Sequence, residues 1–147
     1  MTINIKKPIK INNFSEIDEK YDSIICDIWG VIHNGHELFS SSVECLRRYK
    51  KLGYPIIVAP NAPRPSSEIK VILEKMGLNE KCYDKIITSG DLTQKISNKG
   101  DLGSSCYHIG PDRDLKVFEG VNVKRVDFEN ADFIFVTGLY DCLLYTS

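Results

Sequence analysis

The stretch IICDIWGVIHNG, residues 24–35, decides the fold. Its apolar run ends on a carboxylate, Asp27, and passes at once into a turn with two glycines. This order is expected where a strand delivers an Asp to the mouth of a pocket. The near-continuous apolar character of residues 24–28 is typical of a strand covered on both faces of a sheet. The stretch therefore predicts a buried strand with a candidate catalytic carboxylate at its end.

The segments that follow predict a strand, a helix and a second strand. Residues 40–52 combine apolar side chains every three residues with serines at the start and basic residues near the end, and Gly53 follows them. Serines can cap the N-terminus of a helix, basic residues are favourable in its last turn, and glycine commonly ends it, so this pattern predicts a helix. Residues 54–59 are a second β-rich run. Because such a unit normally joins parallel strands by a right-handed crossover, we expect an α/β fold with a parallel sheet.

The rest of the chain continues this alternation. Residues 60–65 hold three prolines and must form a stiff loop. Residues 66–76 have the best amphipathic helical pattern of the chain, and Gly77 ends it. We expect further strands at 86–88, 106–110, 122–126 and 131–137, with short helices at 91–97 and 113–118. A domain boundary, if the chain has one, is expected at residues 88–90.

Composition narrows the classes of function. A chain of 147 residues can bury a real core, and apolar and charged fractions of 42% and 27% are typical of a soluble globular protein. A net charge of -1 gives no field that would recruit nucleic acid or an anionic membrane. No apolar run approaches the roughly 18 residues of a membrane span. The five cysteines form no CxxC pair and are typical of reduced thiols, so we expect a cytoplasmic protein.

Three residues are candidates for chemistry at the predicted sheet edge. Open α/β sheets bind ligands at the carboxyl ends of their strands, where Asp27 could attack phosphorus and bind Mg²⁺. Asn61 ends the second strand in the equivalent place, and Arg64 follows in the stiff loop. Position alone leaves structural alternatives open: turn contacts for Asp27 and Asn61, and a structural or solvated cation for Arg64.

The histidines give weaker hypotheses. His33 and His36 lie in a glycine-containing loop without a nearby Cys or His to complete a zinc site. His108 falls in a predicted strand, where a core or edge position is expected. The chain has no P-loop, dinucleotide-binding or GxSxG motif. These patterns do not support a zinc enzyme, a nucleotide-binding loop or a serine hydrolase.

Two motifs together resemble a known family. The stretch DIWGVIHNG at 27–35, with VAPNAPRP at 58–65, resembles the haloacid-dehalogenase (HAD) superfamily, and more closely its NagD-like subfamily IIA. Within it, the match is to an uncharacterised group whose first motif reads Asp-x-Trp-Gly-Val-x-His. The likeness continues to about residue 140. It implies a Rossmann-like (HAD-like) parallel-sheet core, partial here, with residues 1–88 as its N-terminal half and 89–147 as part of an inserted α/β cap domain.

The resemblance also implies an activity. It implies hydrolysis of a small phosphorylated metabolite, with Mg²⁺ as cofactor, through an aspartyl-phosphate. By this mapping Asp27 is the nucleophile and a metal ligand, and the backbone carbonyl of Trp29 is a second metal ligand. Gly30, Asn61 and Arg64 are then the phosphate- or substrate-binding residues.

The chain departs from the family pattern in three places. The usual general acid/base, two residues after the nucleophile, is Trp29, whose indole cannot transfer a proton as a carboxyl does. Pro60 replaces the usual Ser or Thr before Asn61. The family's lysine and acidic metal motif come after the cap, whereas this chain stops at Ser147. Asp132 matches the cap's last strand and is expected to be structural.

These departures lead to further expectations. Residues 141–147 no longer resemble the family, which predicts a truncated or frameshifted product that is inactive or only weakly active. Missing strands would leave an open sheet edge and an exposed apolar face, which favour homo-oligomers or aggregation. Two alternatives stay open. One is a non-catalytic binding or regulatory module on the same fold, and the other is a metal-independent dehalogenase-type hydrolase in which Asp27 attacks carbon.

Overall fold

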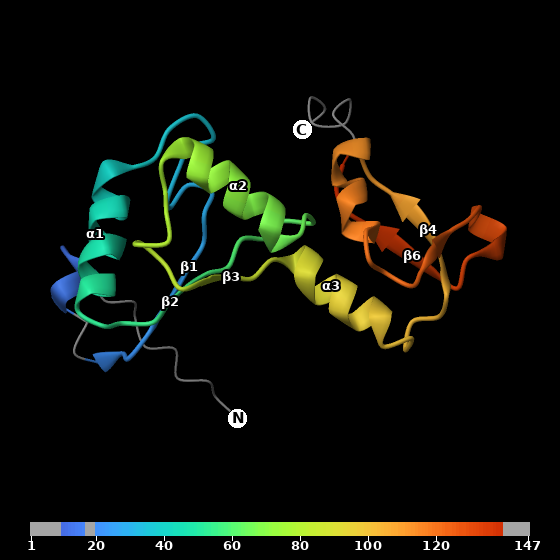
Figure 1. Ribbon diagram of the computed structural model, residues 1–147, viewed down its shortest axis with the longest axis horizontal. Helices are drawn as coiled ribbons and strands as arrows, with labels where there is room; N and C mark the ends of the chain where they lie inside the picture. Colours follow the sequence, from blue (N-terminus) through green and yellow to red (C-terminus); the bar gives the residue numbers. More distant parts are fainter. Residues whose placement is uncertain (1–9, 17–19, 140–147) are drawn as a thin grey trace.

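The computed structural model describes residues 10–16 and 20–139, which form two parallel sheets connected through a helix (Figure 1). The first sheet has the order β1-β2-β3 and the second the order β5-β4-β6, and every pairing is parallel. The α/β class and the parallel sheet are therefore confirmed. The strands are β1 (Ile24–Cys26), β2 (Ile56–Val58), β3 (Lys85–Ile86), β4 (Ser105–Ile109), β5 (Lys124–Arg125) and β6 (Phe133–Val136).

Helices separate the strands as the sequence predicts. Helix α1 (Ser40–Lys51) connects β1 to β2, α2 (Ser66–Met76) connects β2 to β3, and α3 (Ser89–Asn98) runs from β3 toward the second sheet (Figure 1). The short helix predicted at 113–118 is present as a 3₁₀ helix, η3, which begins one residue earlier. Two more 3₁₀ helices are present, and the three together are η1 (Phe14–Glu16), η3 (Asp112–Phe118) and η4 (Phe128–Asn130). We call β1–β3 with α1 and α2 the N-terminal lobe, and β4–β6 with η3 and η4 the C-terminal lobe.

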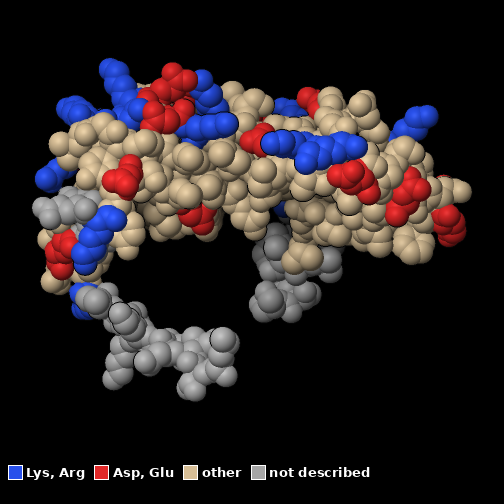
Figure 2. Space-filling view, turned by 90° about the horizontal axis from the view of Figure 1, so that it is seen from below, with Lys and Arg blue, Asp and Glu red and all other residues tan. Residues whose placement is uncertain are grey.

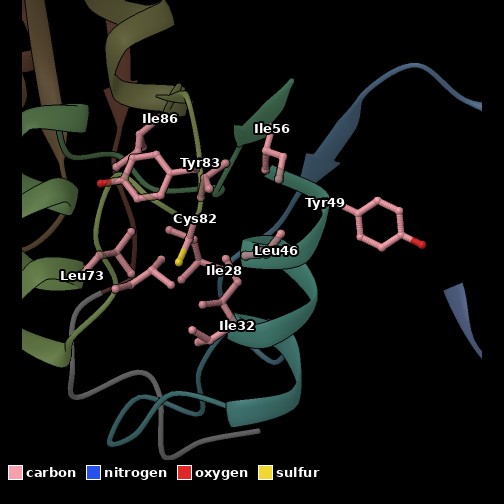
Figure 3. Close-up of a cluster of buried hydrophobic side chains, with 12 residues drawn as sticks. Ile28, Ile32, Leu46, Tyr49, Ile56, Leu73, Cys82, Tyr83 and Ile86 are labelled. Carbon is pink, nitrogen blue, oxygen red and sulfur yellow. The ribbon is translucent and has the colours of Figure 1, made fainter. Parts of the chain in front are cut away.

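The core of the N-terminal lobe lies between its sheet and its two helices (Figure 3). Ile56 from β2 and Leu73 from α2 are completely buried, and Leu46 of α1 packs in the same cluster. Alternation along β2 turns Ile56 and Val58 toward the helices and Ile57 away from them. Helices α1 and α2 thus cover one face of the sheet and hold the carboxyl ends of β1 and β2 in place.

The expectation that the first strand is buried on both faces is wrong. Ile25 is 74% exposed, and its lateral neighbour Ile57 is only partly buried. The reason is that β1 lies at the edge of the three-stranded sheet and turns Ile25 away from the helical layer. The strand also ends at Cys26, two residues earlier than predicted, because the ladder with β2 stops at the pair Cys26 and Val58. Within residues 10–16 and 20–139, the sheet has an exposed apolar face and an open edge, as expected.

The C-terminal lobe has a smaller core. Cys106 of β4 and Phe135 of β6 are buried against Val117 of η3. The alternate residues of β6 face outward, and Ile134 and Val136 are 50% and 63% exposed. The predicted buried strand at 131–137 is therefore covered on one face only.

Asp132 has the structural role that the sequence predicts. Its carboxylate accepts hydrogen bonds from the backbone N–H groups of Ser104 and Ser105, at 2.8 and 3.0 Å. It also accepts one from the Ser105 hydroxyl at 2.9 Å. These bonds lower the pKa of Asp132, so that its carboxylate stays charged while it holds the starts of β4 and β6 together.

Other predictions concern the cysteines and the chain ends. Cys26, Cys45, Cys82 and Cys106 are free thiols, whereas Cys142 and the divergent segment 141–147 lie outside the described residues. In the described part, no helix is both long and apolar enough to cross a bilayer. Basic and acidic side chains are interspersed on the face shown in Figure 2.

Helix α3 begins at Ser89, two residues before the predicted start, because Thr88 and Asp91 form a capping box. Thr88 Oγ1 accepts from the Asp91 N–H, and the Asp91 carboxylate accepts from the Thr88 N–H, both at 3.0 Å. The same carboxylate accepts a 2.9 Å bond from the Ser66 N–H at the start of α2. Asp91 therefore fastens the two helix starts to each other. The predicted boundary at 88–90 falls at this junction, and the assignment of 89–147 to a cap stays a prediction.

Replacing Asp91 by Asn should reduce stability in a pH-dependent way. Burial alone would raise the pKa of Asp91, but the hydrogen bonds from Ser66 and Thr88 outweigh it and lower the pKa. A lowered pKa gives stabilisation that is complete above the unfolded value, about 3.9, and is lost as the pH falls through the folded value. We expect Asp91→Asn to cost about 1 kcal/mol at pH 7 and less near pH 3. Urea unfolding at both pH values measures this. The exposed Asp101→Asn is the control, and an equal cost for Asp91→Asn at both values would contradict the prediction.

Candidate active site

A cavity of about 690 Å³ lies where the carboxyl ends of β1 and β2 face the C-terminal lobe. Four of the predicted site residues line it: Asp27, Trp29, Asn61 and Arg64. Gly30 is not among the lining residues, and its backbone N–H donates to the carbonyl of His33 at 2.8 Å. The structure thus brings four of the five candidates to one cavity, while the chemical role of each stays a prediction.

Asp27 directly follows β1 and is exposed in the cavity wall. One carboxylate oxygen, Oδ1, accepts a 2.7 Å hydrogen bond from the backbone N–H of Ile28. Ile28 is buried in the core of the N-terminal lobe and fixes this end of the carboxylate. Within the described part of the chain, Oδ2 has no hydrogen-bond donor. It is therefore free to act as a nucleophile or a metal ligand.

Asn61 follows β2 and projects from the stiff proline loop. Its Oδ1 atom accepts a 2.8 Å hydrogen bond from the Ser89 hydroxyl at the start of α3. This bond orients the amide and leaves Nδ2 without a hydrogen-bond acceptor among residues 10–16 and 20–139. Because an amide N–H₂ group donates hydrogen bonds, Asn61 can bind an anionic oxygen in the cavity.

Arg64 connects the two lobes. Its Nε lies 3.5 Å from Oδ1 of Asp114, whose side chain is only 6% exposed. Lys116 of η3 makes a parallel connection, with its Nζ 3.2 Å from Oε1 of Glu68 on α2. The structural alternative for Arg64, an ion pair that positions the loop, is therefore observed. Its role in substrate binding stays a prediction.

The C-terminal lobe adds cavity residues that sequence reasoning missed. These residues are Arg113, Asp114, Thr137 and Gly138. The sequence does contain a signal for them, because they lie next to segments that resemble the family. HIGP at 108–111 comes shortly before Arg113 and Asp114, and Gly138 ends the last matched strand. Their sequence separation from Asp27 gives no indication that η3 faces the first strand.

His33 and His108 take structural positions, which is the expectation for His108. His33 is buried, and its Nδ1 accepts a 2.8 Å hydrogen bond from the Gly35 N–H, so His33 organises the loop after Asp27. His108 pairs with the Thr137 hydroxyl at 2.9 Å and packs edge-on against Phe118. Burial, together with the charge of Arg125, lowers the pKa of His108. Neither ring lies in a metal-binding cluster, since the described residues hold no group of three His, Cys, Asp or Glu side chains that could bind a metal.

The oxygen atoms beside Asp27 fit a weakly held Mg²⁺. Oδ1 of Asp27 keeps a lone pair beside its hydrogen bond from Ile28, and the backbone carbonyl of Trp29 accepts no hydrogen bond from the described residues. Mg²⁺ prefers oxygen ligands and commonly binds to one or two protein groups while it keeps several waters. Two oxygens are a minimal set, so the rest of the coordination shell would come from water or from a bound ligand.

The comparisons with known proteins identify the family. A family model described as haloacid dehalogenase-like hydrolase matches residues 24–124, which is more than half of the chain. This chain belongs to the haloacid dehalogenase-like hydrolases. The family accounts for the Rossmann-like arrangement of the N-terminal lobe. No curated protein matches the chain.

Solved structures of HAD-like proteins resemble this chain along most of its length. A haloacid dehalogenase-like hydrolase from Brucella suis 1330 is 34% identical, with a TM-score of 0.81 over 94% of this chain and 52% of its own. NagD from E. coli K-12 is 20% identical, with a TM-score of 0.60 over 78% of this chain and 45% of its own. The 4-nitrophenylphosphatase of Thermotoga maritima is 23% identical, with a TM-score of 0.61 over 78% and 44%. The last two support the fold alone, and this chain spans about half the length of these relatives.

Proposed function

We propose that this HAD-like hydrolase cleaves phosphate esters by transferring the phosphoryl group to Asp27. The observation that carries the proposal is the position of two side chains in one cavity. Asp27 presents a free carboxylate oxygen after β1, and Asn61 presents a free amide donor after the neighbouring strand β2. A nucleophile beside a donor for phosphoryl oxygens is the minimal requirement for such a transfer.

In the proposed reaction, Oδ2 of Asp27 attacks phosphorus as the bond between phosphorus and the leaving-group oxygen breaks. The product is an acyl phosphate on Asp27, and the departing oxygen takes a proton from water. Water then attacks the phosphorus, which releases inorganic phosphate and restores the carboxylate. The Asn61 amide donates a hydrogen bond to a phosphoryl oxygen in both steps. Oδ1 of Asp27 and the backbone carbonyl of Trp29 would hold Mg²⁺, which when bound would neutralise charge on the phosphoryl group.

Trp29 limits this chemistry. General acid catalysis typically contributes about 10²–10⁴-fold, and an indole ring supplies none of it. Together with the small set of metal oxygens beside Asp27, this loss leads us to expect little or no turnover of para-nitrophenyl phosphate by this chain. Formation of the acyl phosphate is the step that its own residues support, and its substrate would be a small phosphorylated metabolite.

Covalent labelling tests the proposed function. The protein is incubated with acetyl phosphate and Mg²⁺, and its intact mass is measured before and after treatment with hydroxylamine. We expect the mass of one phosphoryl group to be added and then removed by hydroxylamine, because hydroxylamine cleaves acyl phosphates but not phosphoserine. No added mass, or an adduct that resists hydroxylamine, would contradict the proposal.

One observation favours a second candidate function. Trp29 and Pro60 both line the cavity in place of groups that would transfer a proton or bind phosphate through a hydroxyl. A non-catalytic binding module on the HAD-like fold would have this composition. It predicts that small phosphorylated ligands bind in the cavity without any covalent label on the protein.

A further inference from the structure

We infer that the hydroxyl of Thr137, backed by the imidazole of His108, activates the water that hydrolyses the acyl phosphate on Asp27. This inference rests on the proposed function, because it names the residues that would release the phosphoryl group from the same site. Three features support it: a hydrogen-bonded hydroxyl–imidazole pair, the place of that pair in the cavity wall, and a smaller polar cavity beside it that can hold water.

Thr137 and His108 form a hydrogen-bonded pair at the carboxyl end of the second sheet. Thr137 Oγ1 lies 2.9 Å from His108 Nε2. His108 is on β4, and Thr137 directly follows the neighbouring strand β6, where its N–H donates to the carbonyl of Ile109 at 3.0 Å. An imidazole within hydrogen-bond reach of a hydroxyl is an arrangement that can take a proton from it.

Neighbouring residues hold the pair in place. The ring of His108 packs edge-on against Phe118, with 5.1 Å between the ring centroids. Gly110 lies directly against the pair, because a Cβ at position 110 would overlap Thr137 Oγ1 and would lie 3.1 Å from His108 Nε2. The segment HIGP at 108–111 thus supplies both the imidazole and the glycine that leaves room for the hydroxyl.

Thr137 lies beside the amide that we propose binds the phosphoryl group. It lines the large cavity together with Asp27, and both Thr137 and Asn61 also line a smaller cavity of about 140 Å³. These two residues therefore lie where the two cavities meet. Water that attacks phosphorus must approach in line with the bond that breaks, from the side away from Asp27. That side faces the C-terminal lobe, which carries Thr137.

The smaller cavity has the size and the lining to hold the attacking water. Its volume of about 140 Å³ is several times the volume of about 30 Å³ that one water takes in the liquid. Ser89 and Thr93 line it next to Thr137. The Ser89 hydroxyl donates to Asn61, and the Thr93 hydroxyl donates to the Ser89 carbonyl at 2.8 Å, so both hydroxyl oxygens can still accept hydrogen bonds. Water in this cavity therefore finds polar partners beside Thr137.

The inferred step balances its atoms and electrons. The oxygen of water bonds to phosphorus as the bond between phosphorus and Oδ2 of Asp27 breaks, and the electron pair of that bond returns to the carboxylate. One proton of the water passes to Thr137 Oγ1, while the Thr137 hydroxyl proton passes to His108 Nε2. The other hydrogen stays on the released phosphate. In this step the neutral His108 ring carries its own proton on Nδ1, and the imidazolium that forms later loses a proton to solvent.

The surroundings of His108 keep its ring neutral. Burial is the main cause that lowers the pKa of His108, and the charge of Arg125 on β5 acts in the same direction. Asp114 and Asp112 of η3 act in the opposite direction but do not outweigh them. A lowered pKa keeps the ring unprotonated at pH 7, since the ordinary value for histidine is about 6.5. His108 can therefore accept a proton at pH 7 and should lose this ability only at lower pH.

The lifetime of the acyl phosphate tests the inference. The protein is labelled with acetyl phosphate and Mg²⁺, the reagent is removed, and the remaining label is followed by intact mass after acid quenching. General base catalysis typically contributes about 10²–10⁴-fold, so we expect the label to persist at least about 10²-fold longer in Thr137→Val and in His108→Gln. Thr137→Ser keeps the hydroxyl and should keep most of the wild-type rate. Because the two groups act in one relay, the double variant should be no slower than the slower single variant.

Two controls separate the relay from general effects. His36→Gln is the matched histidine control, since His36 is exposed and lines neither cavity, and it should leave the lifetime unchanged. The second control is the pH profile of the wild type, which needs no substitution. The lifetime should lengthen as the pH falls below about 6.5, because protonated His108 cannot accept a proton. His108→Gln should lack this step in its profile.

The outcomes distinguish this inference from the proposed function. Equal lifetimes in the wild type, Thr137→Val and His108→Gln, or a wild-type profile without the pH step, would overturn the relay while the label on Asp27 still supports phosphoryl transfer. A label that never forms would overturn both. The structure predicts normal labelling with slow release in Thr137→Val and His108→Gln, and normal release in His36→Gln.

Discussion

Replacing Asp27 by Asn is expected to abolish covalent labelling by acetyl phosphate. The substitution keeps the size of the side chain and an oxygen that can accept the 2.7 Å hydrogen bond from Ile28. It removes the negative charge and the nucleophilic oxygen, so no acyl phosphate can form. Because Asp27 is exposed, the free energy of unfolding should change by less than about 0.5 kcal/mol. Intact mass and urea unfolding measure the two effects separately.

Asp22→Asn is the matched control for this experiment. Asp22 is an exposed carboxylate shortly before β1, at the opposite end of this strand from Asp27, and it does not line the cavity. Its replacement should leave the label at the wild-type level. Labelling that persists in Asp27→Asn, or that falls equally in Asp22→Asn, would show that a different residue accepts the phosphoryl group.

Gly90→Ala is expected to have the largest effect on stability. Gly90 is buried in the first turn of α3, and its N–H donates a 3.0 Å bond to the carbonyl of Ala62. A Cβ at position 90 would lie 2.7 Å from the carbonyl carbon of Pro63 and 2.8 Å from that of Arg64. Both are backbone atoms of a stiff loop and cannot move aside as a flexible side chain can. We expect a loss of about 3 kcal/mol in the free energy of unfolding, at the upper end of overpacking costs.

This substitution should also affect the cavity. The loop that meets Gly90 carries Asn61 and Arg64, so its displacement should lower Mg²⁺-dependent covalent labelling by acetyl phosphate. Gly100→Ala, beyond the other end of α3, is the control: its φ is 80° and a Cβ there meets no atom within 4 Å. Only the left-handed strain of about 1–2 kcal/mol should remain. Equal urea midpoints for the two variants would contradict the close approach of α3 to the loop.

Local patterns in the sequence predict the elements of the fold well. Gly77 ends α2 in a left-handed conformation, as the amphipathic pattern before it indicates. The start of α3 was predicted too late because a capping box is a hydrogen-bond arrangement between Thr88 and Asp91, and apolar periodicity does not report it. The exposure of Ile25 could not be predicted for a different reason. An apolar run shows which residues can be buried, but the number of layers that cover a sheet depends on the rest of the chain.

Some residues of the candidate site could also be placed from the sequence, and others could not. Asp27 and Asn61 could be placed together from the sequence, because two parallel neighbouring strands end at one edge of their sheet. Asp114 could not, since its approach to Arg64 depends on how η3 packs against α3 and the proline loop. The motif after β1 contains Trp29 and Gly35, but their contact depends on the path of the loop that His33 organises.

The central claim is that Asp27 accepts a phosphoryl group, and peptide mapping of the labelled protein tests it most directly. After incubation with acetyl phosphate and Mg²⁺, the acyl phosphate is reduced with borohydride, which converts the modified aspartate to homoserine. Tandem mass spectrometry then locates the changed residue. We predict homoserine at position 27 alone. Homoserine at another aspartate, with Asp27 unchanged, would contradict the account.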